Sequence, residues 1–149
     1  MYALSGTATA AAAVVALLAA GAFGPEAAAA EAEVIKKGDN YRVRAAVAAG
    51  AAKGELTIAI EPTGKWKMDR DKGPATLTLE PPAGLKLERE RYEKSDAEWK
   101  KGGERIRYRI PFERSAKGPH TVKLGFRFVL CTDKLCQMKR FELDYRLGD

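Results

Sequence analysis

The fold is decided by the stretch from His120 to Leu147, which reads HTVKLGFRFVLCTDKLCQMKRFELDYRL. Apolar side chains occupy every second position over most of both halves, as expected for two half-buried β-strands. Between the halves lies a short polar turn, and the chain's only two cysteines, Cys131 and Cys136, bracket it. An even pair of cysteines in this position is a candidate cross-strand disulfide at the tip of a β-hairpin.

A bond between these cysteines would fix the register of the hairpin, because facing residues in an antiparallel pair have sequence numbers with a constant sum. Placing Cys131 opposite Cys136 puts apolar residues opposite each other on the core face and leaves the cysteines on the outward face. Facing Cα atoms in such a pair lie within the range that a disulfide permits. The expected facing pairs are Val122 with Tyr145, Leu124 with Leu143, Phe126 with Phe141, and Lys123 with Asp144, the last a pair of opposite charges.

The same alternation recurs upstream, where short apolar runs are separated by turns rich in glycine and proline. No long stretch in the body has the 3.6-residue period of a helix, and the one short helix candidate begins near Ser95 and ends before Gly102. About seven short strands with this punctuation predict an all-β fold, an immunoglobulin-like antiparallel β-sandwich. The upstream runs are Tyr41 to Val47, Leu56 to Ile60, Leu77 to Leu79, Leu85 to Leu87 and Ile106 to Phe112.

The N-terminal segment has a different composition, with many alanines and no Lys or Arg before residue 34. Its apolar run is broken at Gly24 after about 16 residues, fewer than the roughly 20 that a bilayer span needs. Ala28 and Ala30 have the spacing of a signal-peptide cleavage site. We expect residues 1–30 to be an export signal, with an uncleaved anchor or a disordered leader as alternatives, and residues 31–149 to form one β-sandwich domain.

The body of the chain is strongly basic. Three of the 20 acidic residues and none of the 26 basic residues lie before residue 34, so residues 34–149 have 17 acidic side chains and a net charge of +9. Such a surface favours acidic partners or anionic membranes. Charges of both signs alternate on the polar positions of the expected strands, which is typical of solvated sheet faces. Without a basic helix or an aromatic platform, an exported chain is not expected to bind nucleic acid.

The residues leave two main roles open for the cysteine pair, a redox-active disulfide or a structural one. An oxidising compartment lets a disulfide persist. A closed loop of about six residues contributes only about 2 kcal/mol on the loop-entropy model, so stability alone is a weak reason for it. A metal site or free thiols are poorer alternatives, since two cysteines and the single histidine, His120, cannot complete a structural zinc site without carboxylates. We interpret His120 as an ordinary edge residue, and Trp66 and Trp99 as packing residues.

The surroundings of the pair favour exchange chemistry. Positive charge near a cysteine sulfur favours the thiolate form, and four basic side chains are expected near this pair. The negative charge of Asp133 opposes this effect. Val129 faces Met138 next to the bond, which makes a small apolar patch where a partner or a covering loop docks. We therefore assign partner docking to Val129, Met138 and Lys134. The four basic residues are Arg127, Lys134, Lys139 and Arg140.

Several motifs resemble the N-terminal periplasmic domain of the thiol:disulfide interchange protein DsbD, of the disulfide bond corrector-like family. The hairpin tip CTDKLC at residues 131–136, preceded by HTVKLGFRF at residues 120–128, is similar to that domain's cysteine hairpin. GKWKM at residues 64–68 and PPAGL at residues 81–85 resemble its glycine-aromatic strand and its proline-glycine-leucine turn. The resemblance covers roughly residues 34–147 and implies an immunoglobulin-like sandwich whose cysteines pass electrons by disulfide exchange.

The resemblance also implies a bacterial, periplasmic protein-disulfide oxidoreductase with Cys131 and Cys136 as its exchanging residues and no cofactor or metal. Its expected partners are periplasmic thioredoxin-like or disulfide oxidoreductase proteins, cytochrome c maturation proteins among them. The sequence carries no multi-spanning membrane domain, so we expect a separate membrane electron donor and membrane contact only through an uncleaved N-terminal segment. The basic residues near Cys136 favour it as the attacking cysteine. The competing hypothesis is an exported immunoglobulin-like binding or scaffold module whose disulfide only pins the hairpin.

Overall fold

The computed structural model describes residues 32–49, 52–100 and 105–148, so the expected export signal at residues 1–30 lies outside the described residues. No helix within these ranges is long and apolar enough to cross a membrane. The elements are β1 (Glu33–Lys37), β2 (Tyr41–Ala49), β3 (Lys53–Pro62), β4 (Ala75–Glu80), β5 (Leu85–Leu87), β6 (Arg91–Tyr92), the 3₁₀ turn η1 (Lys94–Asp96), β7 (Glu98–Trp99), β8 (Ile106–Arg114), β9 (His120–Cys131) and β10 (Cys136–Leu147).

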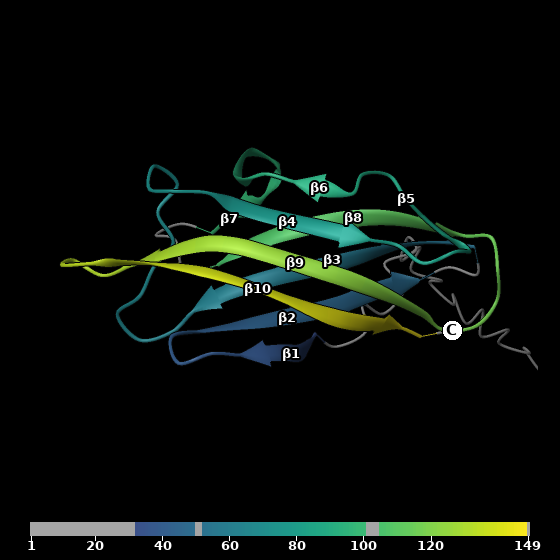
Figure 1. Cartoon of the computed structure of the whole chain (residues 1–149), viewed down its shortest axis with the longest axis horizontal. Coiled ribbons are helices and arrows are strands. Elements are labelled where there is room, and N and C mark those ends of the chain that lie inside the picture. The colour runs from purple at the N-terminus through teal and green to yellow at the C-terminus, as the bar shows by residue number, and fades with distance from the viewer. Residues whose placement is uncertain (1–31, 50–51, 101–104, 149) are drawn as a thin grey trace, which may run out of the picture.

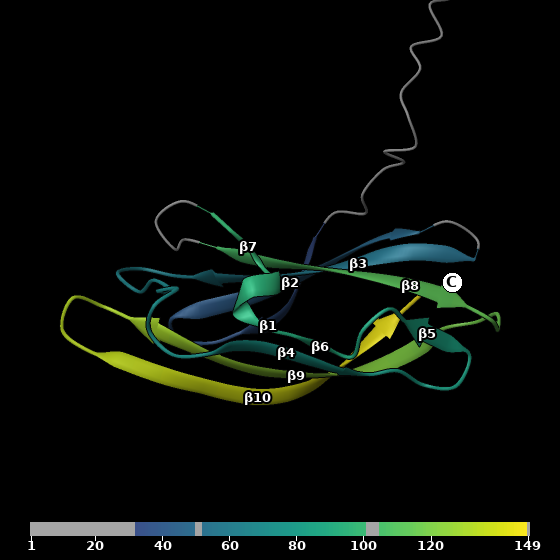
Figure 2. The same ribbon diagram turned by 90° about the horizontal axis from the view of Figure 1, so that it is seen from above.

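Two antiparallel sheets pack face to face, as Figures 1 and 2 show from two directions. Sheet A has the order β1-β2-β3-β8-β5, with β7 also paired to β8, and sheet B has the order β10-β9-β4-β6. The series β2-β3-β8-β5 and β10-β9-β4 match the A-B-E-D and G-F-C sheets of an immunoglobulin domain. The predicted immunoglobulin-like antiparallel β-sandwich is therefore confirmed.

The register predicted for the hairpin is confirmed along its whole length. Cys136 faces Cys131, and each further pair follows with the same sum, as far as Leu147 opposite His120. Lys123 faces Asp144 as expected, but its ion pair is with Glu142, two residues earlier in β10, at 3.6 Å. The alternation of apolar residues thus selects the same register as the cysteines do.

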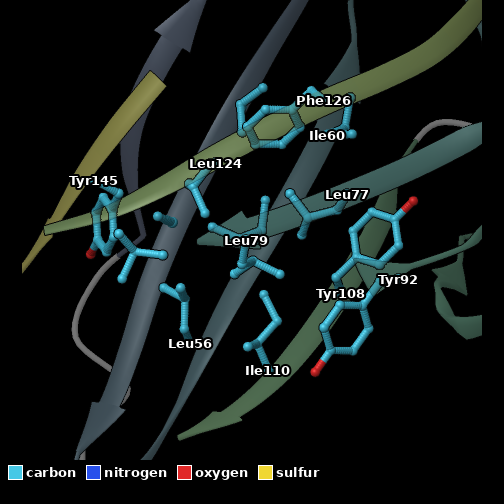
Figure 3. Packing of buried hydrophobic residues seen from close by; sticks show 14 of the residues in the cluster. Leu56, Ile60, Leu77, Leu79, Tyr92, Tyr108, Ile110, Leu124, Phe126 and Tyr145 are labelled. Atoms are coloured by element: carbon cyan, nitrogen blue, oxygen red, sulfur yellow. The ribbon is translucent and has the colours of Figure 1, made fainter. Parts of the chain in front are cut away.

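Aromatic rings join the hairpin to sheet A. Tyr41 of β2 meets Phe128 of β9 edge-on, with ring centroids 5.3 Å apart, and stacks on Phe141 of β10 at 5.6 Å. Between the sheets, leucine and isoleucine side chains of both layers fill the remaining space (Figure 3). Because Phe128 is fully buried, these contacts hold the cysteine hairpin against the sandwich.

Tyr108 of β8 makes a hydrogen bond across the sandwich. Its side chain is fully buried, and its hydroxyl donates to the backbone oxygen of Ala75 in β4 over 2.7 Å. Burial holds the pKa of this phenol well above its ordinary value. The hydroxyl therefore stays protonated and keeps sheet A bonded to the start of β4, directly after the segment that reaches the cysteines.

The short helix candidate near Ser95 is a single 3₁₀ turn and not an α-helix. The chain makes only the single turn η1, which Glu93 caps, and then enters β7, where Trp99 pairs with Ile106 of β8. Trp99 also donates its indole N–H to the backbone oxygen of Lys94 over 2.9 Å. Pairing with β8 and packing of Trp99 against the core override the local helix signal.

The interpretation of His120 as an edge residue is also wrong. His120 begins β9, which lies between β10 and β4, and its side chain is only 5% exposed. The packing role assigned to Trp66 and Trp99 is confirmed, since both are half-buried against the core.

Candidate functional site

The expected disulfide between Cys131 and Cys136 is present at the tip of the β9–β10 hairpin. The S–S distance is 2.07 Å, and the two Cα atoms are 4.0 Å apart. Asp133 and Lys134 form the turn, which is closed by a hydrogen bond from the Thr132 N–H to the Leu135 oxygen over 2.8 Å. The bond therefore joins the last facing pair of two long strands, at the far end of the hairpin in Figure 1.

One of the two cysteines is covered by another part of the chain. Residues 63–74 connect β3 to β4, and we call them the covering segment. The Lys67 N–H donates to the Cys131 oxygen over 2.9 Å, and the Cys131 N–H donates to the Lys67 oxygen over 2.8 Å. As a result Cys131 is only 7% exposed, whereas Cys136 is exposed. The register places both cysteines on the outward face as expected, but there the covering segment buries Cys131 through a long-range contact.

The covering segment is anchored at two further positions after this contact. Met68 is only 3% exposed and belongs to the hydrophobic core. Gly73 lies against Val129, and a Cβ atom at Gly73 would come within 2.4 Å of a Val129 methyl group. Gly73 also has a φ of +75°, which residues other than glycine rarely adopt. The segment therefore lies close against the hairpin, and larger residues do not fit at Gly73.

The residues assigned to partner docking differ in their exposure. Val129 is half-buried beside the covering segment, so the covering loop foreseen as one alternative occupies part of the apolar patch. Met138 is 50% exposed, and Lys134 is exposed in the turn. An incoming protein would therefore meet Cys136, Met138 and Lys134 first, and Val129 only in part.

A basic groove runs between the covering segment, β7 and the hairpin tip, with a volume of about 1130 Å³. Arg70 lies over the Trp99 ring at 5.2 Å, and Lys72 pairs with Asp69 at 3.8 Å. The groove reaches Cys131, so the positive potential that favours a thiolate is built into the fold on this side of the bond. Its charged lining residues are Lys65, Lys67, Arg70, Lys72, Lys100 and Lys134, with Asp69 and Asp133 as the acids.

The basic residues near the disulfide are only partly those expected from the sequence. Lys134 lies where expected, but Lys139 is on the opposite face of the hairpin, with its ammonium group 5.8 Å from the centre of the Tyr41 ring. Arg127 and Arg140 face each other two outward pairs away from the disulfide. Instead, Lys65 and Lys67 line the same groove as Cys131. They come from a connection that has no periodic sequence signal.

The GKWKM motif at residues 64–68 was the one sequence signal for the covering segment. It forms no strand of its own, and its only ladder contact in the described structure is the isolated bridge from Lys67 to Cys131. Among the described residues, no group of three or more His, Cys, Asp or Glu side chains is placed to hold a metal ion.

Comparisons with known proteins give a likeness of architecture. No protein-family model matches the chain, and no curated protein matches it in sequence. A solved structure of the GAE domain of GGA2p from Saccharomyces cerevisiae is similar over 80% of this chain and 99% of its own, with 9% identity and a TM-score of 0.47. A yeast GGA1 GAE domain structure is similar over 77% and 98%, with 14% identity and a TM-score of 0.46. Nothing about function follows from likenesses this distant.

Proposed function

We propose that this protein exchanges disulfides with thioredoxin-like proteins through Cys131 and Cys136. The observation that carries the proposal is the position of the bond at the tip of a projecting hairpin, with Cys136 exposed. The two cysteines are five positions apart, so the bond closes a short loop and contributes only about 2 kcal/mol to stability on the loop-entropy model. The bond contributes little to stability and is accessible to partners. These properties suit a disulfide that undergoes exchange better than a purely structural one.

Exchange would begin at Cys136. A thiolate of the reduced partner attacks the Cys136 sulfur, the bond to Cys131 breaks, and Cys131 leaves as a thiolate. The partner's second thiolate then attacks the mixed disulfide and releases Cys136, so that two electrons pass to this protein and the partner becomes oxidised. Run in reverse, reduced Cys136 attacks an oxidised partner and Cys131 resolves the mixed disulfide. Lys67 and Lys134 would stabilise the thiolates formed in either direction.

The proposed setting follows from the same chemistry. We place the protein in an oxidising compartment, the bacterial periplasm, as a stand-alone relative of the DsbD N-terminal domain. Its partners would be periplasmic thioredoxin-like proteins, including those of cytochrome c maturation, and its reductant a separate membrane-embedded electron donor. The motifs around residues 64–68 and 131–136 and the immunoglobulin-like topology support this assignment.

One observation favours the competing function, an exported immunoglobulin-like binding module with a structural disulfide. Lys67 binds the backbone of Cys131 through two hydrogen bonds, which is an arrangement that protects a bond as well as positioning it. The two functions differ in what happens when a dithiol protein is added, and that difference can be measured.

The test is reduction of the oxidised, full-length protein by a stoichiometric amount of a reduced thioredoxin-like protein. Free thiols are captured at intervals with a maleimide of high mass and counted on a gel. We expect both cysteines to become reactive within minutes in the native protein. A variant with alanine at Cys131 and Cys136 is the control for labelling of the partner alone. A bond that persists for hours in the native protein, but is reduced at once in denaturant, would support the structural function instead.

A further inference from the structure

Arg127 of β9 and Arg140 of β10 face each other directly on the outer surface of sheet B. Both side chains are exposed. Like charges directly opposite each other destabilise an antiparallel pair. Neither guanidinium has a carboxylate partner within the described part of the chain. The free protein therefore maintains an unfavourable contact at this position.

Other basic side chains on the same face of sheet B, unlike the two arginines, have carboxylate partners. Arg91 of β6 pairs with Glu93 at 2.6 Å, and Lys123 of β9 pairs with Glu142 at 3.6 Å. Glu142 lies closest along the strand to Arg140 and could have neutralised it, but its carboxylate is directed to Lys123. Acidic side chains are thus present on this face, and only the arginine pair is left without a carboxylate partner among these four described basic residues.

The hydrogen-bonding pattern brings the two arginines close together. Thr132 bonds to Leu135 across the turn, so the next facing pair, the disulfide, is a pair without backbone hydrogen bonds. Its Cα separation of 4.0 Å fits this closely spaced type. The pattern repeats every two residues, so Arg127 and Arg140 form a pair of the same type, in which facing side chains lie closest.

A small hollow adjoins the arginine pair. Gly125 is part of its lining, and a Cβ atom there would come within 2.4 Å of the Thr78 hydroxyl oxygen. The hollow has a volume of about 220 Å³, and its polar lining is Thr76, Thr78, Arg91, Arg127, Arg140 and Glu142. Arg91 and Glu142 already have ion-pair partners, Glu93 and Lys123. The Thr76 hydroxyl donates to Glu93 and the Thr78 hydroxyl to the Gly125 oxygen. The guanidinium groups of Arg127 and Arg140 are therefore the donors in the hollow without a carboxylate partner among the described residues.

We propose that Arg127 and Arg140 bind the carboxylate of an acidic side chain on a partner protein. Two guanidinium groups around one hollow match a carboxylate in charge and in the geometry of paired hydrogen bonds. The pair lies four residues along the strands from the disulfide, about 13 Å away, with Met138 between them on the same face. A docked partner would therefore place an acidic residue about that far from the sulfurs. The site goes beyond disulfide exchange, since a structural disulfide would leave it equally able to bind.

The probe for this site is a hexaglutamate peptide, titrated into ¹⁵N-labelled oxidised protein at low salt. We expect saturable shifts of the side-chain N–H signals of Arg127 and Arg140 and of the Gly125 amide. Arg140→Gln should weaken binding about tenfold, as expected for loss of a charge-assisted hydrogen bond. The matched control is Arg146→Gln, on the same strand and face but opposite Thr121, which should leave the affinity unchanged within about twofold.

A charge reversal separates binding from a structural role. Arg127→Glu places an opposite charge across from Arg140, so it should abolish peptide binding and raise the thermal midpoint by about 1–5 °C. Equal weakening by Arg140→Gln and Arg146→Gln would overturn the proposal, because net charge alone would then explain binding. Shifts centred on the basic groove at Lys65 and Lys67, or equal shifts with sulfate at the same concentration, would also overturn it.

Discussion

A Cys136 thiol left alone by the substitution Cys131→Ala reacts with a small aromatic disulfide reagent faster than the Cys131 thiol left by Cys136→Ala. We expect the ratio of the two rates to be on the order of tenfold or more, because exchange requires access to the sulfur. Cys131 is only 7% exposed under the covering segment, whereas Cys136 is exposed at the start of β10. The measurement is stopped-flow absorbance of the released thiolate at a fixed pH.

The same two variants in denaturant are the control for this comparison. Their rates should converge there, since the covering segment no longer shields Cys131. Equal rates in the native proteins, or a faster reaction of Cys131, would contradict the assignment of Cys136 as the sulfur that partners attack.

Met68→Ala should destabilise the protein by about 2–5 kcal/mol, as is usual for removal of a buried methionine side chain. Met68 is 3% exposed and anchors the covering segment one residue beyond its hydrogen bonds to Cys131. The free energy of unfolding can be measured in urea from the fluorescence of Trp66 and Trp99. When Met68→Ala is added to the Cys136→Ala variant, the Cys131 thiol should also react faster with the aromatic disulfide reagent than it does in Cys136→Ala alone.

The matched control is Met138→Ala, in which the same residue type is 50% exposed, and its effect should stay within about 0.5 kcal/mol. Met68→Leu keeps the volume and should recover most of the stability, with a loss below about 1.5 kcal/mol. Similar losses at Met68 and Met138 would show that Met68 does not anchor the covering segment.

The hairpin could be predicted from the sequence because two independent patterns agree there. The alternation from Val122 to Leu130 and from Phe141 to Leu147 requires one register, and the cysteines require the same one. A slip by one residue would turn every apolar side chain to the wrong face. The sandwich followed from the same period-two signal in the upstream strands.

The covering segment could not be predicted in this way. Its contact joins Lys67 to Cys131 through backbone groups, and backbone hydrogen bonds leave no pattern in side-chain types. The helix candidate near Ser95 forms only one 3₁₀ turn, because local helix signals are weaker than the pairing of β7 with β8. Lys139 is close to Cys136 in sequence, but the alternation of faces along β10 turns its side chain toward Tyr41 and away from the sulfurs.

The central claim is that the Cys131–Cys136 bond exchanges electrons with other proteins. The midpoint potential of the bond tests this claim most directly. It is measured by equilibrating the native protein in glutathione or dithiothreitol redox buffers and counting alkylated thiols. We predict a value more oxidising than about −300 mV, in the range of bonds that cellular dithiol proteins can reduce. A value well below about −300 mV would mark a structural bond and contradict the claim.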